Sequence, residues 1–102
     1  MTNIVLFCAA GMSTSMLIAK IEKAAVARGL EVKVNAYPEA QVNKYVEGAD
    51  VVLIGPQIRY ALAKIKKVCD EKGVPIEAIA PQDYGMMNGE KVLDQALRLL
   101  KK

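Results

Sequence analysis

The chain has 102 residues, 53% of them hydrophobic, which is enough apolar material for one compact core but not for two. We therefore expect a single domain over residues 1–102. The formal net charge of +3 is too small for the concentrated basic surface that nucleic-acid binding requires. Histidine is absent and the two cysteines, Cys8 and Cys69, lie far apart, which argues against a zinc site.

The N-terminal residues bear on the compartment. They lack the basic start and the long apolar stretch of a secretory signal, so we expect a reducing cytoplasm in which both cysteines remain thiols. The longest apolar runs are far shorter than the roughly 20 residues that a membrane-spanning helix needs. The sequence therefore predicts a cytoplasmic protein. This prediction is compatible with a function at the surface of a membrane.

Strand and helix patterns alternate from the first residues onward. The run from Ile4 to Phe7 is almost wholly apolar, which predicts a strand buried on both faces and ending at Cys8. Apolar residues recur at spacings of three and four from about Ser13 to Arg28, which predicts a helix that Gly29 ends. From Leu30 to Tyr37 apolar and polar residues alternate, as in an edge strand with one exposed face.

The middle of the chain repeats this alternation. A short helix with Val42 and Val46 one turn apart follows the second strand. The stretch DVVLIG, residues 50–55, is the strongest signal for a central strand in the chain. A third helix is predicted over residues 58–73, with Cys69 on its apolar side.

The last third adds one strand and one helix. The stretch VPIEAIA, residues 74–80, predicts a fourth strand, in which Pro75 is tolerated near the start or at an edge. Residues 81–90 mix Pro, Asp, Asn and Gly and predict a loop, and a final helix is expected from about Gly89 to Lys102. Right-handed crossovers join such strands into a parallel sheet. The predicted fold is an open four-stranded parallel α/β sheet with helices on both faces.

The loop after the first strand holds the candidate site. Ligand sites in open parallel sheets lie beyond the carboxyl ends of the strands, and Cys8 lies at such an end. The next helix begins within a few residues, so its unbonded N–H groups and the positive end of its dipole face the loop. Small side chains let the backbone approach a ligand, and hydroxyls donate to phosphate oxygens. The loop residues are Ala9, Ala10, Gly11, Met12, Ser13, Thr14 and Ser15.

These surroundings allow two interpretations of Cys8. Donors at a helix N-terminus favour a thiolate, and the same donors stabilise a phosphoryl group in transit. This predicts a phosphate-binding loop after the first strand, with Cys8 as the nucleophile at its floor. The other interpretation is a small buried hydrophobic residue, which is what a lone cysteine after an apolar strand most often is. For Cys69 we expect the second interpretation, because it falls in step with the apolar side of its helix.

Three stretches, in the same order over nearly the whole chain, carry a family resemblance. They are LFCAAGMSTSML, DVVLIGPQIRY and PQDYG. Together they resemble the B component of the enzyme II complex of the bacterial phosphoenolpyruvate-dependent sugar phosphotransferase system, in its lactose/cellobiose family. The likeness is greatest to the cellobiose, chitobiose and lichenan branch.

The resemblance implies a phosphoryl carrier. In this family a phosphohistidine on the A component passes its phosphoryl group to the cysteine that corresponds to Cys8, and the thiophosphate then donates it to a sugar held by the membrane-embedded C component. That sugar is expected to be a β-glucoside or a related disaccharide, chosen largely by the C component. The resemblance implies no metal or organic cofactor. It also places Pro56, Gln57 and Tyr84 on neighbouring loops at strand ends. We expect a monomer that forms transient complexes and associates peripherally with the membrane transporter.

A low-molecular-weight tyrosine-phosphatase-like thiol phosphatase is the main alternative. In that family an arginine clamps the phosphate, and five residues separate it from the cysteine. Thr14 occupies this position here. It also needs a general acid, for which Asp83 is the only candidate, and a turn residue is the simpler interpretation of Asp83. A non-catalytic anion-binding or thiol redox module is a third interpretation, and the lack of a second cysteine beside Cys8 argues against redox chemistry.

Overall fold

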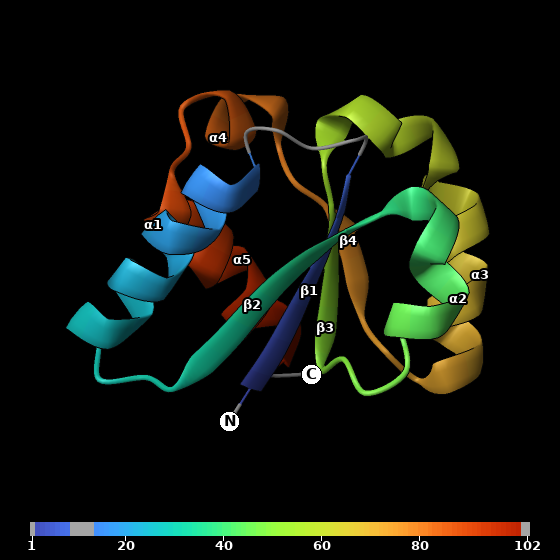
Figure 1. Cartoon of the computed structure of the whole chain (residues 1–102), viewed down its shortest axis with the longest axis horizontal. Coiled ribbons are helices and arrows are strands. Elements are labelled where there is room, and N and C mark those ends of the chain that lie inside the picture. The colour runs from blue at the N-terminus through green and yellow to red at the C-terminus, as the bar shows by residue number, and fades with distance from the viewer. Residues whose placement is uncertain (1, 9–13, 101–102) are drawn as a thin grey trace.

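The computed structural model of the chain describes residues 2–8 and 14–100. Within this part, four strands form one parallel sheet in the order β2-β1-β3-β4 (Figure 1). The strands are β1 (Thr2–Cys8), β2 (Val32–Pro38), β3 (Val51–Ile54) and β4 (Ile76–Ala78). The predicted open four-stranded parallel sheet is therefore confirmed.

The two inner strands are apolar because both of their faces are covered. Every residue of β3 is buried. In β1, Ile4 and Leu6 belong to one hydrophobic cluster, whereas Val5 and Phe7 belong to another on the opposite side of the sheet. Because successive side chains of a strand point to opposite faces, an uninterrupted apolar run serves two cores at once.

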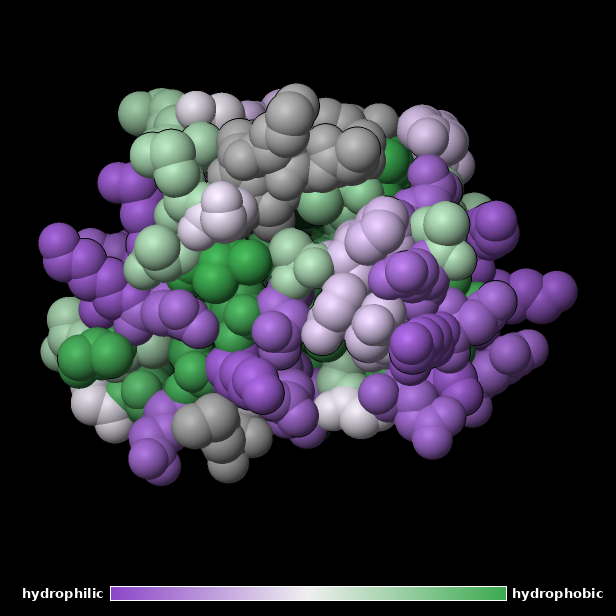
Figure 2. All heavy atoms as spheres, in the orientation of Figure 1, coloured by the Kyte–Doolittle hydropathy of each residue, from purple (hydrophilic) through white to green (hydrophobic). Residues whose placement is uncertain are grey.

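Helices cover both faces of the sheet, as predicted. One face carries α1 (Thr14–Ala27) and α5 (Gly89–Leu100), and the other carries α2 (Val42–Tyr45) and α3 (Leu62–Lys72) (Figure 1). Short connections add the 3₁₀ helices η1 (Glu39–Gln41) and η2 (Pro56–Ala61) and the helix α4 (Pro81–Gly85). Hydrophilic side chains gather over the side of α2 and α3 (Figure 2). None of the helices in the described part of the chain is both long and apolar enough to cross a membrane.

The edge strands also follow their sequence patterns. β2 lies at one edge of the sheet, with Val34 buried and Lys33 exposed. β4 lies at the other edge and is only three residues long. Pro75 directly precedes it, and its carbonyl oxygen accepts a hydrogen bond from the N–H of Val52 at 2.9 Å. The proline therefore contributes to the ladder as an acceptor, at the strand start that was predicted for it.

Two sequence predictions are wrong, and the fourth strand, at residues 76–78, is shorter than the predicted 74–80. The third helix was expected to begin at Ile58, but that residue has φ −116° and ψ 28° inside η2, and α3 begins at Leu62. The segment after Gly55 closes a tighter turn, in which the N–H of Ile58 donates to the carbonyl oxygen of Gly55 at 3.1 Å. The end of α3 is as predicted, because Gly73 caps it in the left-handed conformation.

The predicted loop over residues 81–90 is the second error, because α4 forms there. Pro81 occupies the first turn of this helix, where its fixed φ favours the helical conformation. Asp83 lies in the same turn, where a negative charge is favourable. A helix of five residues is too short to show a helical period in the sequence.

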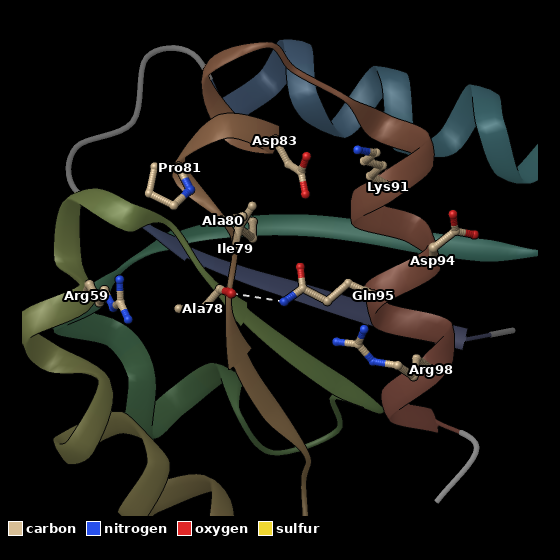
Figure 3. A pocket seen from close by; sticks show the side chains of 10 residues that line it. All are labelled: Arg59, Ala78, Ile79, Ala80, Pro81, Asp83, Lys91, Asp94, Gln95 and Arg98. Carbon is tan, nitrogen blue, oxygen red and sulfur yellow. Dashed lines mark hydrogen bonds between the residues drawn. The ribbon is translucent and has the colours of Figure 1, made fainter.

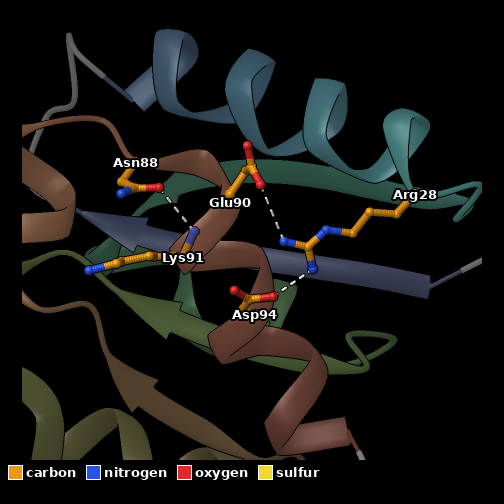
Figure 4. A network of polar contacts seen from close by, with 5 residues as sticks. All are labelled: Arg28, Asn88, Glu90, Lys91 and Asp94. Carbon is orange, nitrogen blue, oxygen red and sulfur yellow. Dashed lines mark hydrogen bonds and ion pairs between the residues drawn. The ribbon is translucent and has the colours of Figure 1, made fainter.

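Ion pairs link the end of α1 to the first half of α5, and a capping contact closes the start of α5 (Figure 4). Arg28, just after α1, forms ion pairs with Asp94 at 2.5 Å and with Glu90 at 3.7 Å. At the start of α5, the side-chain oxygen of Asn88 accepts a hydrogen bond from the N–H of Lys91 at 3.1 Å. α5 thus has a capped first turn and a charged link to the far end of α1. The last residues of the predicted final helix, 101–102, lie outside the described part.

Candidate functional site

Cys8 is the last residue of β1, at the carboxyl edge of the sheet. It lies opposite Pro38 of β2, and the preceding Phe7 lies opposite Ile54 of β3. The residue is 4% exposed. By strand alternation, Cys8 is on the same side of the sheet as Leu6, which is the side that α1 and α5 cover. The thiol therefore lies recessed on the face where the chain enters α1.

α1 supplies the electrostatic part of the site. The helix begins at Thr14, and its first turn contains no acidic residue. The first N–H groups of a helix have no intrahelical acceptor, and the macrodipole places about half a positive charge there. Because no carboxylate in that turn neutralises this charge, the N-terminus of α1 is suited to an anion.

The predicted phosphate-binding loop is only partly covered by the structure. Ala9, Ala10, Gly11, Met12 and Ser13 lie outside the described residues. Thr14 and Ser15 are the first two residues of α1, and Ser15 is exposed. The helix thus begins within a few residues of Cys8, as expected, while the loop's part in phosphate binding stays a prediction.

β3 brings the second predicted stretch to the same edge. Gly55, which directly follows this strand, donates its N–H to the carbonyl oxygen of Phe7 at 2.9 Å. This bond joins the end of β3 to the residue before Cys8. Pro56 and Gln57 come next, as the first residues of η2, so their segment starts beside the end of β1. Their part in the chemistry stays a prediction.

Tyr84 comes from α4 and is a core residue. It is 8% exposed and belongs to the same hydrophobic cluster as Leu17 of α1 and Ile79, which follows β4. Its neighbour Asp83, the candidate general acid of a phosphatase, points across a pocket toward Lys91 of α5 (Figure 3). Asp83 thus lies in the pocket wall between α4 and α5, and this position explains the residue without a role in catalysis.

The second cysteine is a structural residue. Cys69 is fully buried in α3, in the cluster that also contains Phe7 and Ile54. Burial raises the pKa of its thiol from the ordinary 9.0 to about 11, and the negative charge of Asp70 adds to the effect. Cys69 is therefore a neutral thiol at physiological pH, and the prediction that it is a buried core residue is confirmed.

Comparison with known proteins decides the family. The family described as PTS system, lactose/cellobiose specific IIB subunit, matches residues 3–95. The chain belongs to this family. The galactose-specific EIIB component of the PTS system of Lactococcus lactis subsp. cremoris (strain MG1363) is 41% identical, over 95% of this chain and 94% of that protein. The oligo-beta-mannoside-specific EIIB component of Bacillus subtilis (strain 168) is 36% identical, over 98% of this chain and 97% of that protein.

A solved structure agrees with this membership. The cellobiose-specific phosphotransferase IIB component protein from Borrelia burgdorferi is 43% identical and superposes with a TM-score of 0.82, over 98% of this chain and 92% of that one. The chain is thus a phosphotransferase component of a sugar PTS, of the lactose/cellobiose IIB type, and the resemblance found in the sequence is confirmed. IIB components of this type work with IIA and IIC components. The three relatives carry the names of three different sugars, so membership does not fix the sugar.

Sequence reasoning missed one group of charged side chains. Arg59 of η2, Asp83 of α4 and Lys91 of α5 line a common pocket beside β4. The pocket residues of α5 gave a signal in the sequence, because Lys91, Gln95 and Arg98 recur at the spacing of one helix face. The remaining members come from distant parts of the chain, and only the tertiary structure brings them there.

Proposed function

We propose that Cys8 carries the phosphoryl group in this IIB component. The observation that best supports the proposal is the position of Cys8, at the carboxyl end of an inner strand and just before a helix whose first turn has no acidic residue. The loop after Cys8 leads directly to the positive end of α1, and this charge favours the thiolate form of Cys8. The same charge favours the phosphoryl group when it is bound to sulfur.

The transfer then has two steps. The Cys8 thiolate attacks the phosphorus of a phosphohistidine on the IIA component, so that the S–P bond forms as the N–P bond breaks. The other ring nitrogen of that histidine carries a proton, so the leaving group is a neutral imidazole. A hydroxyl oxygen of the sugar on the IIC component next attacks the same phosphorus. The O–P bond forms, the S–P bond breaks, the hydroxyl proton passes to a base on the acceptor side, and the thiolate is restored. Neither step changes an oxidation state or needs a metal or organic cofactor.

The surroundings of Cys8 have supporting parts in this proposal. Backbone N–H groups and hydroxyls of residues 9–15 bind the phosphoryl oxygens, with Thr14 and Ser15 at the helix start. Pro56 and Gln57 border the site from the start of η2, and Tyr84 supports it from α4. The whole chain, residues 1–102, acts as one domain and as a cytoplasmic monomer that docks transiently on the IIA component and at the membrane on the IIC component. The sugar is a β-glucoside or a related disaccharide, in keeping with the cellobiose and oligo-beta-mannoside names among the relatives.

Intact-protein mass spectrometry tests the proposal. The chain is incubated with phosphoenolpyruvate, the two general proteins of the phosphotransferase system and a cognate IIA component. We expect one phosphoryl adduct on the parent chain and none on the Cys8→Ser variant. Cys69→Ala is the matched control, because it removes the other thiol and should keep the adduct. An adduct that persists on Cys8→Ser would place the acceptor at another residue.

The phosphatase alternative is tested with the same proteins. A thiol phosphatase would turn over p-nitrophenyl phosphate without a IIA component, and it would hydrolyse the adduct instead of retaining it. A carrier is expected to show neither behaviour at an appreciable rate. Cys8-dependent turnover of p-nitrophenyl phosphate would therefore contradict the carrier mechanism.

A further inference from the structure

A pocket of about 520 Å³ opens at the outer edge of the sheet, beside β4 (Figure 3). β4 is an edge strand, and no further strand of the described chain covers its outer side. α5 forms one wall of the pocket, and η2 with the start of α4 forms the other. The volume falls within the range of about 300–1,000 Å³ that is usual for small-molecule sites.

Two cations in this pocket have charge available for a ligand. Arg98 is already bound to Glu77, with 2.7 Å between the guanidinium nitrogen and the carboxylate oxygen. Arg59 and Lys91, in contrast, form no ion pair with any residue in the described part of the chain. Guanidinium and ammonium groups bind phosphate and carboxylate oxygens strongly. A ligand with an anionic group therefore fits this pocket, and a cation that the anion leaves free can donate to a hydroxyl oxygen.

The pocket also presents oxygen atoms that accept hydrogen bonds. The amide nitrogen of Gln95 donates to the carbonyl oxygen of Ala78 at 2.9 Å and to the carboxylate of Glu77 at 2.5 Å, which holds this side chain in place. Its own carbonyl oxygen then points into the pocket (Figure 3). The carboxylate of Asp83 points toward Lys91 from the other side (Figure 3). Because these oxygens are acceptors, the ligand needs donors such as hydroxyl groups.

The remaining wall is apolar. Ala80 and Pro81, which follow β4 and are exposed, line the pocket on the side of the sheet. The C–H face of a sugar ring matches such a wall, while a small inorganic anion leaves it uncovered. The pocket therefore combines a site for an anionic group, acceptors for hydroxyls and a surface for a ring.

We propose that this pocket binds a phosphorylated monosaccharide, with its phosphate on Arg59 and its hydroxyl groups on Gln95, Asp83 and Lys91. The proposal goes beyond the carrier role, because the transfer at Cys8 uses none of these four residues. It also needs no phosphoryl group on the protein, so binding is measurable on the unmodified chain.

The position of the pocket gives it a regulatory use, and this part rests on the proposed function. Ala78 lies opposite Ile54, which lies opposite Phe7, the residue before Cys8. Two strand spacings of about 4.8 Å separate the rim of the pocket from the end of β1. A ligand in the pocket lies beside the edge that a phosphoryl donor must approach. A phosphorylated monosaccharide bound there then slows phosphorylation of Cys8.

An NMR titration tests the binding. The ¹⁵N-labelled chain is titrated with glucose 6-phosphate, glucose and inorganic phosphate in separate series. We expect glucose 6-phosphate to shift amide signals from residues 78–83 and 91–98, and the two fragments to bind much more weakly. Arg59→Gln is expected to lower the affinity for glucose 6-phosphate about tenfold and to leave the affinity for glucose unchanged. Lys67→Gln is the matched control, because it removes an exposed cation from α3, which does not line the pocket.

Several outcomes would overturn the proposal. They are no shift at millimolar glucose 6-phosphate, shifts at other residues, an equal loss of affinity in Lys67→Gln, or identical shifts from inorganic phosphate, which would mark a simple anion site. The regulatory part has its own measurement, the ratio of Cys8 phosphorylation rates with and without glucose 6-phosphate. We expect a ratio below one for the unmodified chain and near one for Arg59→Gln. If Cys8 accepts no phosphoryl group, the carrier proposal fails, while the titration still decides the pocket.

Discussion

Gly89 at the start of α5 lies directly against the backbone of Lys20 in α1. A Cβ atom at Gly89 would be 2.5 Å from the carbonyl carbon and 2.6 Å from the carbonyl oxygen of Lys20, and 2.7 Å from the nitrogen of Ile21. Real Cβ atoms do not approach other atoms this closely, so any larger residue must push the two helices apart. The position of α1, and with it the helix end that follows the Cys8 loop, therefore depends on a glycine in another helix.

Gly89→Ala is expected to destabilise the chain. The added methyl group meets backbone atoms, which cannot rotate away, and such overpacking costs about 1–3 kcal/mol. Urea unfolding followed by circular dichroism measures the loss in the free energy of unfolding. Gly85→Ala is the matched control, because a Cβ there meets nothing within 4 Å, and its free energy of unfolding is expected to change little. Equal stability of the two variants would contradict the close packing of α5 on α1.

Gly73 offers a prediction about backbone conformation alone. Its φ of 70° and ψ of 27° end α3 in the left-handed region, and a Cβ there would meet no other atom within 4 Å. Gly73→Ala is therefore expected to cost about 1–2 kcal/mol from strain without any clash. Gly73→Asn should recover part of this loss, because asparagine tolerates the left-handed conformation better. Thermal unfolding of the three chains measures the effect, and an alanine variant as stable as the parent would argue against the left-handed cap.

The sheet was predictable because its signals are local. Ile4 to Phe7 and Val51 to Ile54 are continuous apolar runs, and such runs are characteristic of inner parallel strands regardless of the rest of the fold. The cysteine at the end of the first run was likewise visible in the sequence. α4 was missed because a helix of five residues has no detectable period. The contact between Gly89 and Lys20 and the pocket beside β4 were invisible, because they depend on residues far apart in the chain.

Tyr60 and Glu39 form a link across the edge of the sheet that contains Cys8. The hydroxyl of Tyr60 donates to a carboxylate oxygen of Glu39 at 3.1 Å, which connects η2 after β3 with η1 after β2. This bond and the negative charge of Glu39 both disfavour the phenolate and raise the pKa of Tyr60 above its ordinary 10.0. The bond is present at neutral pH and is lost as the pH rises through that raised pKa.

Glu39→Gln is expected to lower the pKa of Tyr60 toward 10.0, because a neutral amide does not repel the phenolate. An NMR titration of the tyrosine ring signals measures the change. Glu31→Gln serves as the control, because it removes a carboxylate that forms no ion pair or hydrogen bond with Tyr60. The same titration midpoint for Tyr60 in the parent and in Glu39→Gln would show that the contact does not persist in solution.

The buried thiol of Cys69 predicts how stability depends on pH. In the unfolded chain this thiol ionises near its ordinary pKa of 9.0, whereas in the folded chain burial raises the pKa to about 11. The folded state therefore keeps a proton that the unfolded state releases between these values, so the stabilisation is complete below pH 9 and is lost as the pH rises toward 11. Two pKa units correspond to at most about 3 kcal/mol. Urea unfolding at pH 8 and at several higher pH values measures this loss. Cys69→Ala should be less stable than the parent below pH 9, because of the small cavity it leaves, and its stability should fall less steeply above pH 9. An unchanged slope in Cys69→Ala would assign the loss of stability to the lysines and tyrosines that titrate in the same range.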